Sequence, residues 1–83
     1  MARIHVGDRC SAFPGARLGT VRYVGLVPEI KAPKPNTLWI GVQFDMPVGT
    51  NDGSIFGATR YFSCPEKYGS FCKPDILTVG DFP

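Results

Sequence analysis

The sequence predicts an all-β domain, a small and strongly bent antiparallel sheet or barrel with little or no helix. Ten glycines and eight prolines are spread through the 83 residues, so every regular segment must be short. Apolar and polar residues alternate with a period of two in several runs, and none of these runs has a helical period. A chain of this length buries roughly 60% of its unfolded surface, which supports one small core and one domain.

The first strong strand pattern covers residues 18–27, where β-branched and aromatic residues occur without a helical period. Residues 5–11, by comparison, are polar with isolated apolar residues. The next segment, from Pro28 to Asn36, contains three prolines, which lack the amide donor of a strand ladder, so we expect an exposed loop. Strict alternation over the strand predicts one face with Val21, Tyr23 and Gly25 and an opposite face with Thr20, Arg22 and Val24.

The second strand pattern covers residues 38–45. On one of its faces an indole lies beside a glycine backbone, which makes a shallow groove that a partner side chain can enter. An ordinary core position is the alternative for a lone tryptophan in a small β domain. The alternation assigns Leu38, Ile40, Val42 and Phe44 to the core, and Trp39, Gly41, Gln43 and Asp45 to the groove face.

Three further segments complete the predicted sheet. Residues 54–62 alternate around Gly57, where a β-bulge is expected. Because Tyr61 and Phe62 are adjacent in a strand, at most one of them can face the core. A turn at residues 65–67 leads into residues 68–71, and residues 75–79 form a last short strand. The sheet therefore has six or so strands.

Two glycines bracket three small polar residues in the run from Gly49 to Gly53, of sequence GTNDG. The glycines permit positive φ and close approach by another molecule, which is typical of a loop that docks a peptide. We expect Asp52 to accept backbone N–H groups and fix the turn, because an aspartate that precedes a glycine in a tight loop commonly does so.

Four runs of the chain resemble the CAP-Gly domain family: residues 39–42 (WIGV), 49–53 (GTNDG), 60–62 (RYF) and 68–71 (YGSF). The resemblance extends from Gly7 to Pro83. Within the family, residues 19–25 (GTVRYVG) and 79–83 (VGDFP) are most similar to tubulin-folding cofactor B members. One residue departs from the family pattern, since Thr50 stands where the family loop, GKNDG, has a lysine.

The resemblance implies a compact, SH3-like β barrel that binds acidic C-terminal tails ending in Glu-Glu-Tyr or Glu-Glu-Phe. In this reading Trp39 and Phe71 wall a slot for the terminal ring, Asn51 hydrogen-bonds the peptide, and Lys73 attracts its carboxylates. Thr50 brings no charge, so Lys31 or Lys34 in the Pro-rich loop is expected to compensate. An aromatic that the family has before the tryptophan is replaced by Lys34. The longer loop gives its role to Ile30 or Leu38 or leaves it empty, so the third wall of the slot is unassigned. The predicted peptide-binding residues are Trp39, Gly49, Thr50, Asn51, Gly53, Phe71 and Lys73.

The cofactor B resemblance implies a cytoplasmic, cytoskeleton-associated partner of the α-tubulin tail, acting in tubulin heterodimer assembly or disassembly together with tubulin-folding cofactor E. The alternative inside the family is a module of a microtubule plus-end protein that binds tubulin or end-binding-protein tails. From another class, a small barrel that binds single-stranded nucleic acid would also use exposed aromatics. A net charge of +2 with seven acidic residues disfavours that alternative.

Enzymatic, metal and cofactor sites are not expected. The single histidine, His5, lies near the N-terminus, where nothing holds it against Cys10 for nucleophilic catalysis. The three cysteines follow no metal-ligand spacing, and an odd number of thiols indicates a reduced, intracellular chain. No apolar run approaches the roughly 18 residues of a membrane span. We expect residues 1–6 to be a flexible segment and residues 7–83 one CAP-Gly domain excised from a longer protein.

Overall fold

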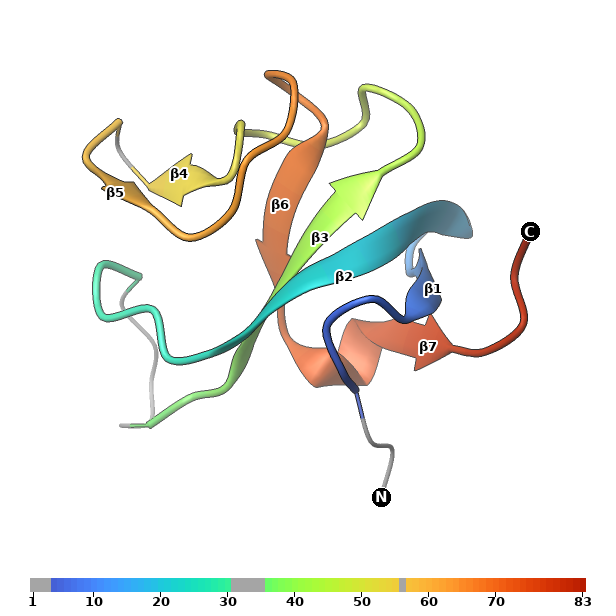
Figure 1. The fold of residues 1–83 in the computed structure, drawn as a ribbon. Coiled ribbons are helices and arrows are strands. Elements are labelled where there is room, and N and C mark those ends of the chain that lie inside the picture. Colours follow the sequence, from blue (N-terminus) through green and yellow to red (C-terminus); the bar gives the residue numbers. More distant parts are fainter. Residues whose placement is uncertain (1–3, 31–35, 56) are drawn as a thin grey trace.

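The computed structural model describes residues 4–30, 36–55 and 57–83. A five-stranded antiparallel sheet of order β6-β3-β2-β1-β7 forms the body of the domain, and a two-stranded sheet, β4-β5, lies at one side of it (Figure 1). The predicted all-β class with almost no helix is confirmed. The elements are β1 (Arg9–Ala12), β2 (Arg17–Gly25), β3 (Trp39–Phe44), β4 (Ser54–Ile55), β5 (Thr59–Arg60), β6 (Gly69–Cys72), the 3-10 turn η1 (Pro74–Ile76) and β7 (Leu77–Val79).

The core lies on one face of the five-stranded sheet and draws on every strand of it. Of the buried residues, Phe44, Ile40, Val21, Val42 and Cys10 have almost no exposed surface. Both outer strands contribute, Cys72 from β6 and Leu77 from β7, so the sheet curls around this single cluster. This curvature agrees with the strong bend that the sequence predicted.

Strand β1 was missed by the sequence reading, which found only isolated apolar residues over 5–11. Cys10 and Ala12 are completely buried, whereas Arg9 and Ser11 alternate with them and are partly exposed. The strand pairs with β2 on one side and β7 on the other. Four residues are too few to show a periodic pattern. The strand forms because it is hydrogen-bonded to a neighbouring strand on each side, which its own sequence does not reveal.

A β-bulge at Arg22 corrects the predicted faces of β2. Val21 pairs with Val42 and Tyr23 with Gly41, so Arg22 is an extra residue between them. The bulge reverses the alternation beyond it, so Val24 packs against the core and Tyr23 lies on the opposite face. The prediction that Val21 and Tyr23 share a face was therefore wrong.

Other details of the strand predictions also change. Leu38 is not in the core but precedes β3 and is 44% exposed. Gly57, with φ of 67°, lies in the turn between β4 and β5 and not at a bulge. The last strand begins two residues later than expected, because Asp75 and Ile76 belong to the 3-10 turn. The loop after β2 is described only in part, since residues 31–35 lie outside the described ranges.

Candidate functional site

A cluster of four aromatic rings covers the face of the sheet opposite the core. Tyr23 comes from β2 and Phe71 from β6, and Tyr61 and Phe62 follow β5. The ring centroid of Phe71 lies 5.5 Å from that of Tyr61 and 5.6 Å from that of Phe62, and Tyr23 lies 4.8 Å from Tyr61. These are tilted or edge-to-face contacts, which aromatic pairs prefer.

The centre of this face can take an aromatic ring because β3 has a glycine there. A Cβ built on Gly41 would lie 2.6 Å from Phe62 Cε1 and 3.0 Å from Tyr23 Cβ. Gly41 pairs with Tyr23 on one side and with Phe71 on the other. The missing side chain is therefore what lets Phe62 pack onto the sheet between the two neighbouring rings. Phe62 is buried, whereas the other three rings are partly exposed.

The GTNDG loop is held against the start of β6 by its own backbone. The N–H groups of Thr50 and Asn51 both donate to the Gly69 carbonyl, at 2.8 and 3.0 Å, and the Gly69 N–H donates to the Asn51 carbonyl at 2.8 Å. A Cβ on Gly49 would lie 2.4 Å from the Gly69 oxygen, and a Cβ on Gly53 only 2.0 Å from the Phe62 oxygen. Both glycines thus allow close approach of the chain's own backbone, but only Gly53, with φ of 98°, has the positive φ expected at the bracketing positions.

Asp52 fixes this loop, as predicted. Its Oδ1 accepts hydrogen bonds from the Ser54 N–H and hydroxyl, at 3.2 and 2.5 Å, and Arg60 Nη2 lies 3.2 Å from Oδ2. The Ser54 hydroxyl, the Ser54 N–H and Arg60 together lower the Asp52 pKa to about 2. The Asn51 side chain also supports the loop, because its Oδ1 accepts the Gly53 N–H at 2.9 Å.

A pocket of about 300 Å³, which we call the edge pocket, lies where this loop meets β6. Three of the predicted binding residues, Thr50, Asn51 and Phe71, line it. Ile30, from the loop after β2, lines it as well, and it is one of the two residues considered for the unassigned third wall. The complete lining is Ile30, Thr50, Asn51, Ser54, Ile55, Ser70 and Phe71.

The other predicted residues lie outside this lining. Trp39 begins β3 on the same side of the strand as Gly41 and is partly exposed. Lys73 is exposed and follows β6 directly. Lys31 and Lys34, the expected compensating cations, fall in the 31–35 gap outside the described residues. The sequence did not predict Tyr23 as a site residue. Strand alternation assigned it to the same face as Val21, and the bulge places it on the opposite face.

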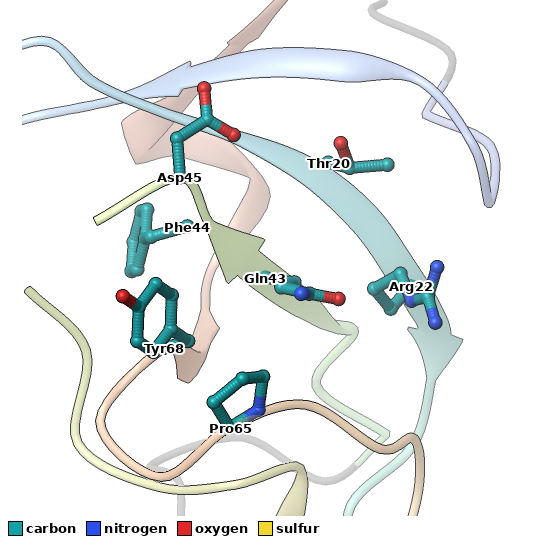
Figure 2. A pocket seen from close by; sticks show the side chains of 7 residues that line it. All are labelled: Thr20, Arg22, Gln43, Phe44, Asp45, Pro65 and Tyr68. Atoms are coloured by element: carbon teal, nitrogen blue, oxygen red, sulfur yellow. The ribbon is translucent and has the colours of Figure 1, made fainter. Parts of the chain in front are cut away.

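A second hollow of about 360 Å³, the face pocket, lies on the same side of the sheet. Figure 2 shows Thr20 and Arg22 on β2 and Gln43 on β3, with Pro65 and Tyr68 from the segment before β6 across from them. At its rim the Asp45 carboxylate takes two hydrogen bonds from Arg9, at 2.6 and 2.9 Å, which lower the pKa of Asp45. Arg22 is exposed there. The lining combines polar side chains with Phe44, Pro65 and Tyr68, and it includes no residue of the glycine-bracketed loop.

The cysteines and the histidine form no reactive constellation among the described residues. Burial raises the pKa of Cys10 to about 11 and also raises those of Cys72 and Cys64. His5 is exposed. Within the described ranges, no three histidine, cysteine or acidic side chains gather as metal ligands. The described part of the chain also contains no helix with the length and apolarity of a membrane span.

Comparison with known proteins identifies the family of this chain. The CAP-Gly domain family matches residues 6–77. The chain is 53% identical over 83 residues to tubulin-folding cofactor B of Bos taurus and 51% identical over 79 residues to cell polarity protein alp11 of Schizosaccharomyces pombe. These matches cover 96% and 95% of this chain but only 32% of each relative, so the chain spans about a third of their length.

The fold is matched by a solved structure of the same family. The solution structure of the CAP-Gly domain in human kinesin-like protein KIF13B superimposes with a TM-score of 0.77 at 32% identity, covering 95% of this chain and 72% of that one. The family match includes β1 through β6 and the whole GTNDG loop. The chain therefore belongs to the CAP-Gly domain family, whose members are non-catalytic binding domains, and its curated relatives include tubulin-folding cofactor B proteins.

Proposed function

We propose that this domain binds the acidic, aromatic-ended C-terminal tail of α-tubulin and is the tubulin-recognition module of a cofactor B-like chaperone. The edge pocket carries this proposal, because it brings Thr50, Asn51 and the partly exposed Phe71 ring together beside the aromatic cluster. A terminal ring needs an apolar slot, and the chain-end carboxylate needs donors close to that slot. Both requirements are met by residues that line one pocket.

Charge supports the same ligand. Lys73 is exposed, directly follows β6 and lies two residues beyond Phe71 in the chain, so a cation is available to the glutamates before the terminal ring. The acidic side chain in the loop, Asp52, is neutralised by Arg60. The formal net charge of +2 favours association with an acidic peptide and is too small to favour a nucleic-acid backbone.

The names of the relatives suggest the cellular process in which the domain would act. Several are named tubulin-folding cofactor B or tubulin-specific chaperone B. In a full-length protein of that kind, the domain would hold α-tubulin by its tail in the cytoplasm while cofactor E acts on the heterodimer. The recognition of end-binding-protein tails, which share the acidic and aromatic ending, is the second use that the same pocket chemistry allows.

Calorimetric titration of an α-tubulin tail peptide, with and without its final aromatic residue, tests the proposal. We expect the complete peptide to bind at least tenfold more tightly, a difference of about 1.4 kcal/mol. Lys73→Gln should weaken binding and flatten its salt dependence. Lys67→Gln, which removes an exposed lysine before the start of β6 whereas Lys73 follows its end, is the matched control. Equal affinity for both peptides, or tighter binding of a single-stranded oligonucleotide, would refute the proposal.

A further inference from the structure

The free edge of β6 borders the edge pocket. In the five-stranded sheet β6 is an outer strand, paired with β3 on one side. On its other side, the described residues offer one partner, the bridge between Asn51 and Gly69. Phe71, two residues further along β6, lines the pocket that continues from this bridge.

The register shows which backbone groups of β6 point toward that pocket. Gly69 exchanges both of its hydrogen bonds with the Asn51 backbone, so its N–H and C=O point away from β3. In an antiparallel strand these directions alternate from residue to residue. The pairing of β6 with β3 is continuous from Gly69 to Cys72, so the Phe71 N–H and C=O point the same way as those of Gly69. The N–H and C=O groups of Ser70 and Cys72 point toward β3.

We propose that the domain holds its acidic peptide by strand addition, with one peptide residue exchanging main-chain hydrogen bonds with Phe71. This inference rests on the proposed function and adds how the ligand is held. The backbone of Thr50 and Asn51 already pairs with β6 at Gly69. The peptide would pair with the next open position of the same edge, at Phe71. Strand addition gives affinity through the main chain and leaves specificity to side chains in adjoining pockets.

The dimensions and charge of the edge fit a chain-end segment of an acidic peptide. Strand β6 has four residues, and Pro74, which has no N–H, follows Lys73. The open part of the edge is therefore limited to Phe71 and its neighbours, too short to template a long strand. Lys73 supplies a positive charge where the strand ends, which suits the carboxylates of the same peptide. The edge pocket, at about 300 Å³, takes a side chain of the bound segment.

An amide-to-ester scan of the α-tubulin tail peptide tests this directly, because each ester removes one N–H donor without adding bulk. We expect one position to lose roughly tenfold in affinity, the effect of an unmade hydrogen bond, while the esters on either side of it stay within about twofold. Hydrogen exchange of the Phe71 amide should slow when the peptide is saturating. The Ser70 amide, already directed at β3, is the internal control.

The outcomes separate the two proposals. If the unmodified peptide does not bind, both the proposed function and strand addition are wrong. If the peptide binds and every ester is tolerated equally, strand addition alone is wrong and the ligand is held by its side chains. A single sensitive position together with slowed exchange at Phe71 supports the docking mode.

Discussion

Tyr61 donates a hydrogen bond to the Glu29 carboxylate, joining the aromatic cluster to a loop that lies 32 residues earlier in the chain. Hydrogen bonds from the Thr59 hydroxyl and then from Tyr61 lower the pKa of Glu29. Glu29 in turn raises the pKa of Tyr61 to about 12. The next residue of the loop, Ile30, lines the edge pocket, so this contact positions one wall of the candidate site.

The Glu29–Tyr61 contact should make stability depend on alkaline pH. The Tyr61 pKa is about 12 in the folded protein against an ordinary value of 10, so its contribution is present below pH 10 and is lost as the pH rises toward 12. Phenolate absorbance during an alkaline titration measures this. Glu29→Gln should lower the pKa of Tyr61, and Tyr61→Phe should remove the highest transition. An unchanged titration curve in Tyr61→Phe would contradict the assignment.

Asp52 should make the domain sensitive to strong acid. Its pKa is lowered from 3.8 to about 2, so the stability it contributes is present above pH 4 and is lost as the pH falls toward 2. Thermal unfolding between pH 2 and 5 should show a smaller acid dependence in Asp52→Asn than in the wild type. Ser54→Ala, which removes the hydroxyl donor named first among the causes, should raise the Asp52 pKa in carboxyl carbon NMR.

Replacing Gly53 by alanine should destabilise the domain by more than about 2 kcal/mol. The new Cβ would lie 2.0 Å from the Phe62 carbonyl oxygen, and φ is 98° there. Gly57→Ala is the matched control, because φ is 67° there but no atom of the described residues lies within 4 Å of the new Cβ. That variant should lose only about 1 to 2 kcal/mol, the cost of the left-handed backbone. Denaturant unfolding of both variants gives the difference, and equal losses would rule out the clash.

Gly41→Ala should also destabilise the domain, by about 1 to 3 kcal/mol, because its Cβ would overlap the Phe62 ring. A smaller partner should relieve this overlap, so Phe62→Leu combined with Gly41→Ala is expected to lose less than the sum of the single changes. A double-mutant cycle of unfolding free energies measures the coupling. Additive losses would mean that Gly41 is not what admits the ring.

Restoring the family lysine through Thr50→Lys should raise affinity for the acidic tail by roughly two- to thirtyfold, because a charge-assisted hydrogen bond replaces a neutral one. Thr50 is exposed and lines the edge pocket, so a longer side chain meets no packed interior. Thr50→Gln adds length without charge and is the control. Calorimetry at two salt concentrations should show the gain shrinking at high salt for lysine only.

The sequence predicted the general architecture well because it depends on patterns that repeat. Alternation identified the inward side chains of β3 from Ile40 to Phe44, and the glycine-bracketed run identified the loop that contacts β6. Strand β1 was not predicted because four residues are too few to show an alternating pattern. Its position depends on pairing with β2 and with β7, which is distant in the chain. Features that arise from pairing between strands cannot be predicted from the sequence of one strand alone.

The candidate site was predicted in part for the same reason. Thr50, Asn51 and Phe71 belong to recognisable motifs, and the structure brings them into one pocket. Ile30 also lines this pocket, but it belongs to a proline-rich loop whose sequence has no periodic pattern. Tyr23 lies in the aromatic cluster because of the bulge at Arg22, and a single sequence does not predict the position of a bulge. Trp39 lies on the predicted side of β3 but outside the lining of that pocket.

The extra residue at Arg22 has a consequence for how this surface can change over evolution. Deleting Arg22 would leave Val21 and Tyr23 as neighbours opposite Val42 and Gly41, so Tyr23 would stay in the outer cluster and Val24 would stay over the core. The deletion would remove only the local bend and twist of the bulge. In a regular ladder, by contrast, a one-residue deletion turns every later side chain to the opposite face, so position 22 should tolerate the loss of a residue better than the interior of β3 does.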